Sequence, residues 1–330
     1  MTDWKQRPEG GGRFAIWLIR SIARYGGRAV ARLCLYPITA YFTLVRAPER
    51  RASIEYLTRV LGRPAGLRDG ARHVYTFAST ILDRVFLLGG RIDAFDVTLH
   101  GLDDIHAALD RGKGVLLFGS HLGSFEVLRV LARRRPEYTI RVVLDKQQSP
   151  VMTQLLDELN PEIAAGVIDA SQDGPSIVMA IHQACSAGAM VAMLVDRARG
   201  DEPTLPAPFL GAEARFPTAP WLIAAALKVP VVLGFGLYRG GNRYELVFES
   251  FADGVEVPRG QRAAALSALI RRYASRLETF ARSAPYNWFN FYDFWQPHPD
   301  DAPAQEHAAP ALDDAAVQRR TALRRRAAGG

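Results

Sequence analysis

The sequence predicts an α/β fold in which a mainly parallel sheet is flanked by helices. Short apolar runs bounded by turn residues, typical of buried strands, alternate with longer stretches whose apolar residues recur at the helical period. Strands and helices that alternate in this way form parallel sheets, because each helix carries the chain back to the start of the next strand. The 330 residues and their 48% hydrophobic content suffice for a real core.

The elements of this fold follow one another from residue 47 onward. The predicted strands are residues 95–99, 115–118, 140–144, 190–195, 231–238 and 244–248. The predicted helices are two units within residues 47–90, then residues 101–112, 152–159, 176–187, 217–227 and 262–282. The last two strands are joined by RGGN, which is a hairpin signal. We therefore expect the sheet to end in an antiparallel edge.

The stretch GSHLGSFE lies at the junction between a predicted strand and a predicted helix. We expect Gly119 and Ser120 to form the turn and the helix to begin near residues 122–124. On one ideal helix His121 and Glu126 would point about 140° apart, but a carboxylate can reach a histidine that lies in the preceding turn. A carboxylate that holds one imidazole nitrogen leaves the other free to act as a general base.

Two further predicted strands end in charged residues. Asp145 and Lys146 follow one of them, and Asp196 and Arg197 follow another. Ligands of parallel sheets bind beyond the carboxyl ends of the strands, so these turns and His121 form a candidate site. For the pair at 196–197, an ion pair that merely closes the strand is the alternative. No glycine-rich nucleotide fingerprint occurs at a strand–helix turn, and a histidine occupies the serine position of the G-x-S-x-G motif.

Composition limits the cofactor and the compartment. Cys34 and Cys185 lie in apolar surroundings without metal-ligand spacing, so we expect no metal site, no disulfide framework and a reducing compartment. The first residues, MTDWKQRPEGGGR, are polar and give no cleavable secretory signal. Residues 1–51 hold ten Lys and Arg against three acids, an excess that equals the +7 net charge of the chain. Basicity is therefore a property of the N-terminal segment.

That segment is also strongly apolar. Arginines recur every four residues, which predicts a helix with a basic stripe: Arg20, Arg24, Arg28 and Arg32. The uncharged run at residues 33–45 contains Pro37 and is too short to span a bilayer. We expect an interfacial anchor whose arginines contact anionic lipid headgroups, and a helix packed on its own domain is the alternative. Bulky aliphatic residues between the arginines argue against nucleic acid as a partner.

Three stretches together resemble a known family. HLGSFE is similar to the H-x4-D/E motif of the lysophospholipid and lipid A acyltransferase superfamily. DRARGDEPTLPAPFLGAEARFPTAPWLIAAALKVPVV resembles the segment of bacterial lipid A late acyltransferases in which an acidic strand end leads into a turn, a helix and a Pro-Val strand. NWFNFYDFW resembles the C-terminal aromatic segment of a subgroup associated with aryl polyene or xanthomonadin-type pigment clusters. The resemblance covers residues 15–295.

The resemblance implies a glycerolipid-acyltransferase-like fold and a reaction. A fatty or polyene acyl chain would move from an acyl carrier protein thioester, or from acyl-CoA, to a hydroxyl of a lipid-like acceptor. No other cofactor is implied, and the expected partners are acyl carrier protein and membrane lipids. His121 would be the general base and Glu126 its partner. No covalent acyl-enzyme is expected, because neither cysteine lies near the motif.

Further residues are candidates for binding the substrate. Backbone N–H groups near Gly123, or the side chains of Lys146 or Arg197, would stabilise the tetrahedral oxyanion. The resemblance places the segment around Phe216 beside the acyl pocket, with the start of the next helix as the alternative. The complete set of expected substrate contacts is Ser120, Gly123, Lys146, Asp196, Arg197 and Phe216. We expect the aromatic residues of NWFNFYDFW mainly to pack in the core.

Departures from the family pattern concern the acceptor. Lipid A enzymes usually carry a second acid where this chain has Ala198, and basic residues near the position of the acidic Asp201 and Glu202. An arginine expected after the next strand is replaced by Asp145. These positions are where acceptor phosphates would be bound. The changes therefore argue against lipid A itself as the acceptor and leave the acyl-transfer chemistry intact.

The expected domain organisation has three parts: a membrane anchor at residues 1–46, an acyltransferase domain at 47–298 and a disordered tail at 299–330. The expected location is the cytoplasmic face of a bacterial inner membrane, with peripheral or monotopic attachment. One alternative is a lipid A or lysophospholipid acyltransferase proper. An inactive lipid-binding scaffold and a lipid esterase, in which His121 would activate water, are alternatives from other classes.

Overall fold

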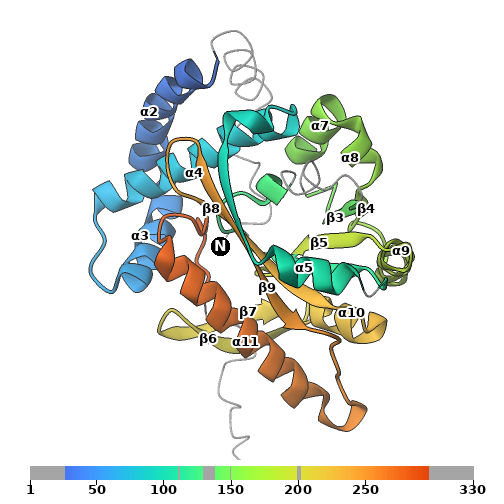
Figure 1. The fold of residues 1–330 in the computed structure, drawn as a ribbon. Coiled ribbons are helices and arrows are strands. Elements are labelled where there is room, and N and C mark those ends of the chain that lie inside the picture. Colours follow the sequence, from blue (N-terminus) through green and yellow to red (C-terminus); the bar gives the residue numbers. More distant parts are fainter. Residues whose placement is uncertain (1–26, 111, 129–137, 149, 199–201, 297–330) are drawn as a thin grey trace, which may run out of the picture. The chain divides into compact units, whose positions relative to one another are not determined.

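The computed structural model describes residues 27–110, 112–128, 138–148, 150–198 and 202–296. The chain divides into two units, residues 1–294 and 295–330, and every described helix and strand belongs to the first. Within this unit, helices surround a seven-stranded sheet, and a separate two-stranded sheet accompanies it (Figure 1). This arrangement confirms the predicted α/β class.

The seven-stranded sheet has the order β1-β9-β8-β2-β5-β3-β4. Its strands are β1 (Asp96–His100), β2 (Val115–Gly119), β3 (Ile140–Leu144), β4 (Ile168–Asp169), β5 (Met190–Leu194), β8 (Val231–Tyr238) and β9 (Arg243–Ala252). Strands β8, β2, β5, β3 and β4 run parallel, so their carboxyl ends share one edge of the sheet. Strand β9 is antiparallel to β8, and β1 pairs with β9 beyond it. The predicted hairpin is therefore confirmed, and β9 and the edge strand β1 both run opposite to the other five strands.

Nine described α-helices accompany the sheets. They are α2 (Gly27–Val45), α3 (Ala47–Leu61), α4 (Leu67–Leu88), α5 (Leu102–Leu109), α7 (Pro150–Leu159), α8 (Pro161–Ala165), α9 (Gly174–Ser186), α10 (Ala219–Leu227) and α11 (Arg262–Ser283), besides the short 3-10 helices η2 (Ile92–Ala94), η3 (Phe125–Leu128) and η4 (Arg259–Gln261). The sequence missed α8 and β4. It also missed the antiparallel pair β6 (Thr204–Phe209) and β7 (Ala212–Pro217), because prolines at 206 and 208 weaken the strand signal.

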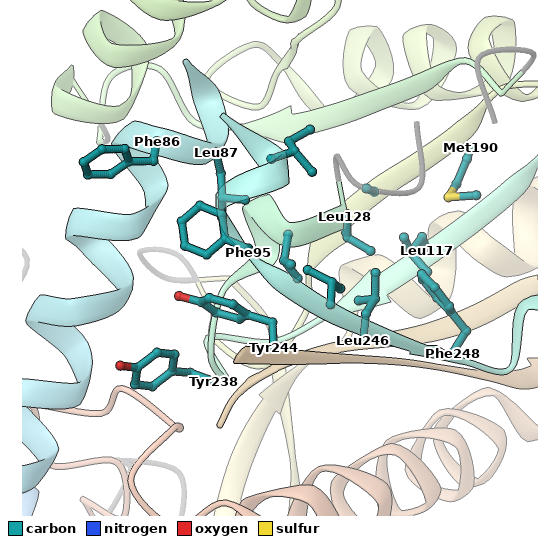
Figure 2. Packing of buried hydrophobic residues seen from close by; sticks show 14 of the residues in the cluster. Phe86, Leu87, Phe95, Leu117, Leu128, Met190, Tyr238, Tyr244, Leu246 and Phe248 are labelled. Carbon is teal, nitrogen blue, oxygen red and sulfur yellow. The ribbon is translucent and has the colours of Figure 1, made fainter. Parts of the chain in front are cut away.

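Strand β2 lies in the middle of the core, and all five of its residues are buried. On one face, Leu117 joins a cluster with Met190, Leu246 and Phe248, which residues of α4 extend (Figure 2). On the other face, Phe118 packs edge-to-face against Trp221 of α10, with ring centroids 5.2 Å apart. Because both faces of β2 are covered, the turn that follows it starts from a fixed position.

The chain is not yet helical at residues 122–124, where the sequence predicts that a helix begins. Leu122 and Gly123 instead form β-bridges to Trp288 and Gly236, and the chain becomes helical only at η3. Gly123 has φ +71°, which ends any right-handed helical path at that residue. Residues 129–137, which include the basic run at 133–135, lie outside the described part of the chain.

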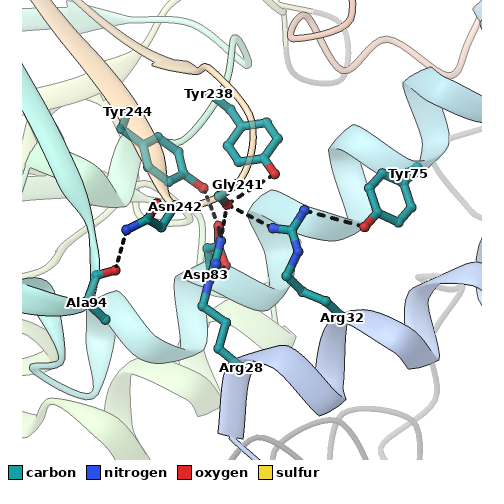
Figure 3. Close-up of polar contacts among 9 residues, drawn as sticks. All are labelled: Arg28, Arg32, Tyr75, Asp83, Ala94, Tyr238, Gly241, Asn242 and Tyr244. Atoms are coloured by element: carbon teal, nitrogen blue, oxygen red, sulfur yellow. Dashed lines mark hydrogen bonds and ion pairs between the residues drawn. The ribbon is translucent and has the colours of Figure 1, made fainter.

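Helix α2 packs against α4, and two arginines of the predicted basic stripe face the domain (Figure 3). Arg28 forms a bidentate pair with the buried Asp83, with contacts of 2.7 and 2.8 Å, and Arg32 donates to the Gly241 carbonyl at 2.9 Å. These two side chains therefore hold α2 on the domain and do not extend toward lipid headgroups. Arg20 and Arg24 lie outside the described residues.

The opposite face of α2 is apolar. Its exposed residues are Ala29, Val30, Leu33, Tyr36, Pro37, Ala40, Tyr41, Leu44 and Val45. The buried face consists of Ala31, Leu35, Thr39 and Thr43. Among the residues that the structure describes, no helix is both long and apolar enough to cross a membrane.

Candidate active site

The site begins where the neighbouring strands β2 and β5 end. Gly119 and Leu194 are partners in the strand register, and His121 and Asp196 each follow two residues later. Their side chains meet, because Nδ1 of His121 lies 2.8 Å from Oδ1 of Asp196. Parallel register alone thus brings together two residues that are 75 positions apart in the sequence.

Asp196 is fully buried, and each of its carboxylate oxygens accepts hydrogen bonds. Oδ2 accepts from the backbone N–H of His121 at 3.1 Å and from the indole N–H of Trp288 at 3.0 Å. Burial acts to raise the pKa of this carboxyl, but His121 and Arg197 together hold that pKa well below its usual range. Asp196 is therefore an anion, and Nδ1 of His121 must donate the hydrogen that joins them.

His121 is consequently held as the tautomer whose Nε2 carries the free lone pair. Its side chain is 38% exposed, and Nε2 has no partner among the residues that the structure describes. Desolvation and the nearby Arg197 charge lower the pKa of the imidazole and outweigh the opposing effect of Asp196. The result is a neutral ring with an accessible basic nitrogen, which a general base requires.

The structure places Asp196, and not Glu126, on the imidazole. The Glu126 carboxylate lies 2.7 Å from Nε of Arg84 on α4 and accepts a 3.1 Å hydrogen bond from the Ser124 hydroxyl. The expected contact with His121 is wrong because Leu122 and Gly123 are held in β-bridges and the Glu126 carboxylate pairs with Arg84 on α4. Asp196, for which the sequence predicts a substrate contact, instead occupies the partner position.

The backbone N–H groups of the His121 turn are already used. Gly123 donates to the Asn287 carbonyl and Ser124 to the Gly236 carbonyl, both at 2.8 Å. Of the backbone N–H groups near Gly123 that were expected to serve an oxyanion, those of Gly123 and Ser124 are therefore occupied within the protein. A Cβ on Gly123 would collide with the Gly236 carbonyl, so the turn depends on a glycine with positive φ at this position.

A C-terminal segment, residues 287–289, fixes the turn from the other side. The Asn287 amide pairs with both backbone groups of Tyr238 at the end of β8. Trp288 forms a bridge with Leu122, and the Phe289 N–H donates to the His121 carbonyl at 2.9 Å. The sequence showed this stretch only as an aromatic cluster. The asparagines within this otherwise apolar run could have indicated that the segment fixes a neighbouring backbone, since a buried amide must find hydrogen-bond partners.

Arg197 is the cation with the larger effect on His121, and Arg84 is the other. Its guanidinium donates to the Phe289 carbonyl at 2.6 Å and lies over the ring of Tyr292, 5.3 Å from the centroid. Its Nε is 3.8 Å from Oδ2 of Asp196, so the pair is close without being bidentate. These contacts aim a positive charge at the edge where His121 lies.

The other predicted site residues are Ser120, Phe216 and Lys146, and they lie in three different parts of the fold. Ser120 is buried directly after β2, where the Tyr273 hydroxyl donates to the preceding carbonyl of Gly119 at 3.1 Å. Phe216 is fully buried and packs edge-to-face on Phe209, with ring centroids 5.7 Å apart. Lys146 follows β3, which β5 separates from β2, and its backbone N–H donates to Asp169 at 3.4 Å. The structure thus does not join Lys146 to the His121–Asp196 pair.

The fold and this site define an α/β protein in which a histidine is held by a buried carboxylate at adjacent strand ends. Residues 88–296 match the model of the bacterial lipid A biosynthesis acyltransferase family, and the chain belongs to that family. The match spans His121, Asp196 and Trp288, and it confirms the resemblance to the lipid A acyltransferase family. Comparison with curated proteins gives no match.

Proposed function

We propose that the protein is an O-acyltransferase that moves an acyl chain from an acyl carrier protein thioester to a hydroxyl of a lipid-like acceptor. Family membership supports the acyltransferase class. The observation that carries the proposal is the His121–Asp196 pair, which presents an unpartnered, exposed Nε2 at the sheet edge where ligands bind. Acyl-CoA is the alternative donor.

The geometry supports a direct transfer. Nε2 of His121 takes the acceptor hydroxyl proton while the oxygen attacks the thioester carbonyl carbon. The tetrahedral intermediate then collapses, the C–S bond breaks, and the imidazolium returns the proton to the leaving sulfur. Asp196 stabilises the imidazolium throughout. Arg197 is the candidate for stabilising the oxyanion, because its charge already acts on His121 and the Gly123 N–H is occupied.

The acceptor class that we propose is a polyene-type or related membrane lipid. Support comes from Asp145 and Glu202, which stand where the family pattern has basic residues for acceptor phosphates. Lipid A and lysophospholipids are the alternative acceptors. A phosphate-poor acceptor fits acidic residues at these positions better than a bisphosphorylated one, because like charges repel.

We further propose attachment to the cytoplasmic face of a bacterial inner membrane. The apolar face of α2 supports this, with Leu33 64% and Leu44 67% exposed. An apolar helix face held on the domain by Arg28 and Arg32 can enter the interface of a bilayer without spanning it. The basic excess of residues 1–51 would strengthen binding to anionic lipid.

The test is transfer of a labelled acyl chain from acyl carrier protein into total membrane lipid by the full-length protein and by His121→Ala. We expect label in a lipid band with the wild type only, and the mass of that band would name the acceptor. Release of free acid that depends on His121 would favour a lipid esterase. Equal background labelling by both proteins, with competent donor and acceptor, would indicate a lipid-binding scaffold and contradict the proposal.

A further inference from the structure

The second oxygen of the Asp196 carboxylate, Oδ2, accepts two hydrogen bonds, one from the backbone N–H of His121 and one from Trp288. The indole N–H of Trp288 donates at 3.0 Å, and the side chains of Asp196 and Trp288 are both fully buried. Oδ1 is occupied by the imidazole. Trp288 therefore helps, together with the His121 backbone N–H, to fix how the carboxylate plane is oriented toward Nδ1 of His121.

Trp288 is itself held by a second histidine. Nε2 of His73 on α4 lies 3.0 Å from the Trp288 carbonyl oxygen, and Nδ1 lies 2.7 Å from the Ser53 hydroxyl of α3. A carbonyl can only accept, so Nε2 of His73 must carry its proton and Nδ1 must accept from the serine. His73 is fully buried, and burial lowers its pKa to about 4, so it stays neutral at physiological pH.

These contacts form one continuous series from the N-terminal helices to the reactive histidine: Ser53, His73, Trp288, Asp196 and His121. We propose that Trp288 is a positioning residue for the His121–Asp196 pair, and that His73 fixes Trp288 through its backbone carbonyl. The inference rests on the proposed function, because it concerns the same base. The indole N–H of Trp288 reaches the His121–Asp196 pair through its hydrogen bond to Asp196.

The N–H of Trp288 shares the negative charge of Asp196. Without it, the carboxylate would attract the His121 imidazolium more strongly and the ring would become easier to protonate. Trp288→Phe should therefore move the acidic limb of the kcat profile to higher pH. It should also reduce kcat about 10- to 100-fold, since a hydrogen bond to a charged group is lost, and leave KM unchanged.

Trp221→Phe is the matched control. Trp221 is also fully buried, but its indole N–H has no hydrogen-bond partner among the residues that the structure describes. Replacing it removes aromatic packing without removing a bond to Asp196. If both variants lose activity equally, or if the acidic limb does not move in Trp288→Phe, the positioning role is refuted.

A second pair of variants, both at His73, keeps the test decisive if Trp288→Phe fails to fold. The glutamine amide introduced by His73→Gln can still donate to the Trp288 carbonyl, whereas the leucine of His73→Leu cannot. We expect the first variant to retain most activity and the second to reproduce the upward shift of the limb. Equal profiles for the two variants would contradict the role of His73.

A nuclear magnetic resonance titration of the His121 ring separates this inference from the proposed function. The pKa of His121 should be higher in Trp288→Phe than in the wild type, whether or not acyl transfer is detected. An unchanged titration would overturn the inference even in an active enzyme. If the wild type transfers no acyl chain but the pKa of His121 is still higher in Trp288→Phe, only the proposed reaction is refuted.

Discussion

At the scale of single residues, the charge state of His121 is set by opposing neighbours. Asp196 favours the imidazolium, whereas burial and Arg197 favour the neutral ring. The effects of burial and Arg197 are the larger, so the pKa of His121 is lowered. A neutral base at physiological pH is the state that can accept a proton from a hydroxyl. The same buried carboxylate fixes which nitrogen is available.

The first prediction concerns pH. His121 must be neutral to act, so activity is full above its pKa and is lost as the pH falls through that value. Because desolvation and Arg197 lower the pKa from 6.5, the acidic limb of the kcat profile should lie below pH 6.5. Arg197→Gln should move the limb upward, whereas Arg259→Gln on the exposed η4 should not. A wild-type limb above pH 6.5 would contradict this electrostatic picture.

The second prediction concerns Glu126. Its carboxylate contacts Arg84 and Ser124, so its influence on His121 should pass through the Arg84 charge. Arg84→Gln, Glu126→Gln and the double variant form a cycle in which the losses should not add. We expect a coupling of about 0.5–3 kcal/mol in kcat/KM. Additive losses would mean that Glu126 acts on the site independently of Arg84.

The sequence could indicate His121 but not its partner. His121 stands out because it follows a buried strand and two small residues. Glu126 is close to it in sequence, and nearness in sequence favoured the wrong carboxylate. Asp196 is the partner because β5 pairs with β2 in register, and no local pattern reveals which strands will be neighbours.

At the scale of elements, the active-site turn depends on three segments that approach closely. Residues 121–124, the end of β8 and residues 287–289 exchange backbone hydrogen bonds. The contact between Gly123 and Gly236 leaves no room for a side chain at either residue. Strands and most helices were predictable because their apolar periods are local, whereas this contact and the β6–β7 pair join distant or proline-containing segments.

The third prediction tests that contact. In Gly236→Ala the new Cβ would collide with the Ser124 carbonyl and displace the His121 turn. We expect the free energy of unfolding to fall by about 1–3 kcal/mol. We also expect kcat to fall in protein that is still folded, because the His121 turn is displaced. Gly254→Ala is the control, because its Cβ would meet its nearest atom at an ordinary 3.7 Å. The measurements are chemical denaturation and kinetics on both variants. A fully active Gly236→Ala would contradict the claim that this close contact holds the His121 turn in place.

At the scale of the whole molecule, helix α2 turns its polar contacts toward the domain and an apolar face outward. Its polar contacts point inward, where Arg28 neutralises the buried Asp83 and Tyr244 donates to the same carboxylate at 2.9 Å (Figure 3). Its outward face is apolar along the whole helix. The sequence indicated a basic, apolar segment but could not assign the arginines to the protein side, since that depends on the buried Asp83.

The fourth prediction concerns this surface. The full-length protein should float with vesicles that contain anionic phospholipid, and Leu33→Glu/Leu44→Glu should weaken that binding at least about tenfold, because two apolar side chains no longer enter the interface. Met179→Glu is the control, since Met179 is 57% exposed on α9. Undiminished flotation of the double variant, or equal loss in the control, would show that the α2 face does not carry binding.

The most direct test of the account is the acyl-transfer rate of Asp196→Asn. Two N–H groups point at Oδ2, so the asparagine would place its carbonyl oxygen there and turn its NH₂ toward Nδ1 of His121. That arrangement forces the proton onto Nε2 and removes the base. We predict a loss of about 10²–10⁴-fold in kcat with a folded protein, approaching that of His121→Ala. A rate near that of the wild type would show that the His121–Asp196 pair does not perform the chemistry.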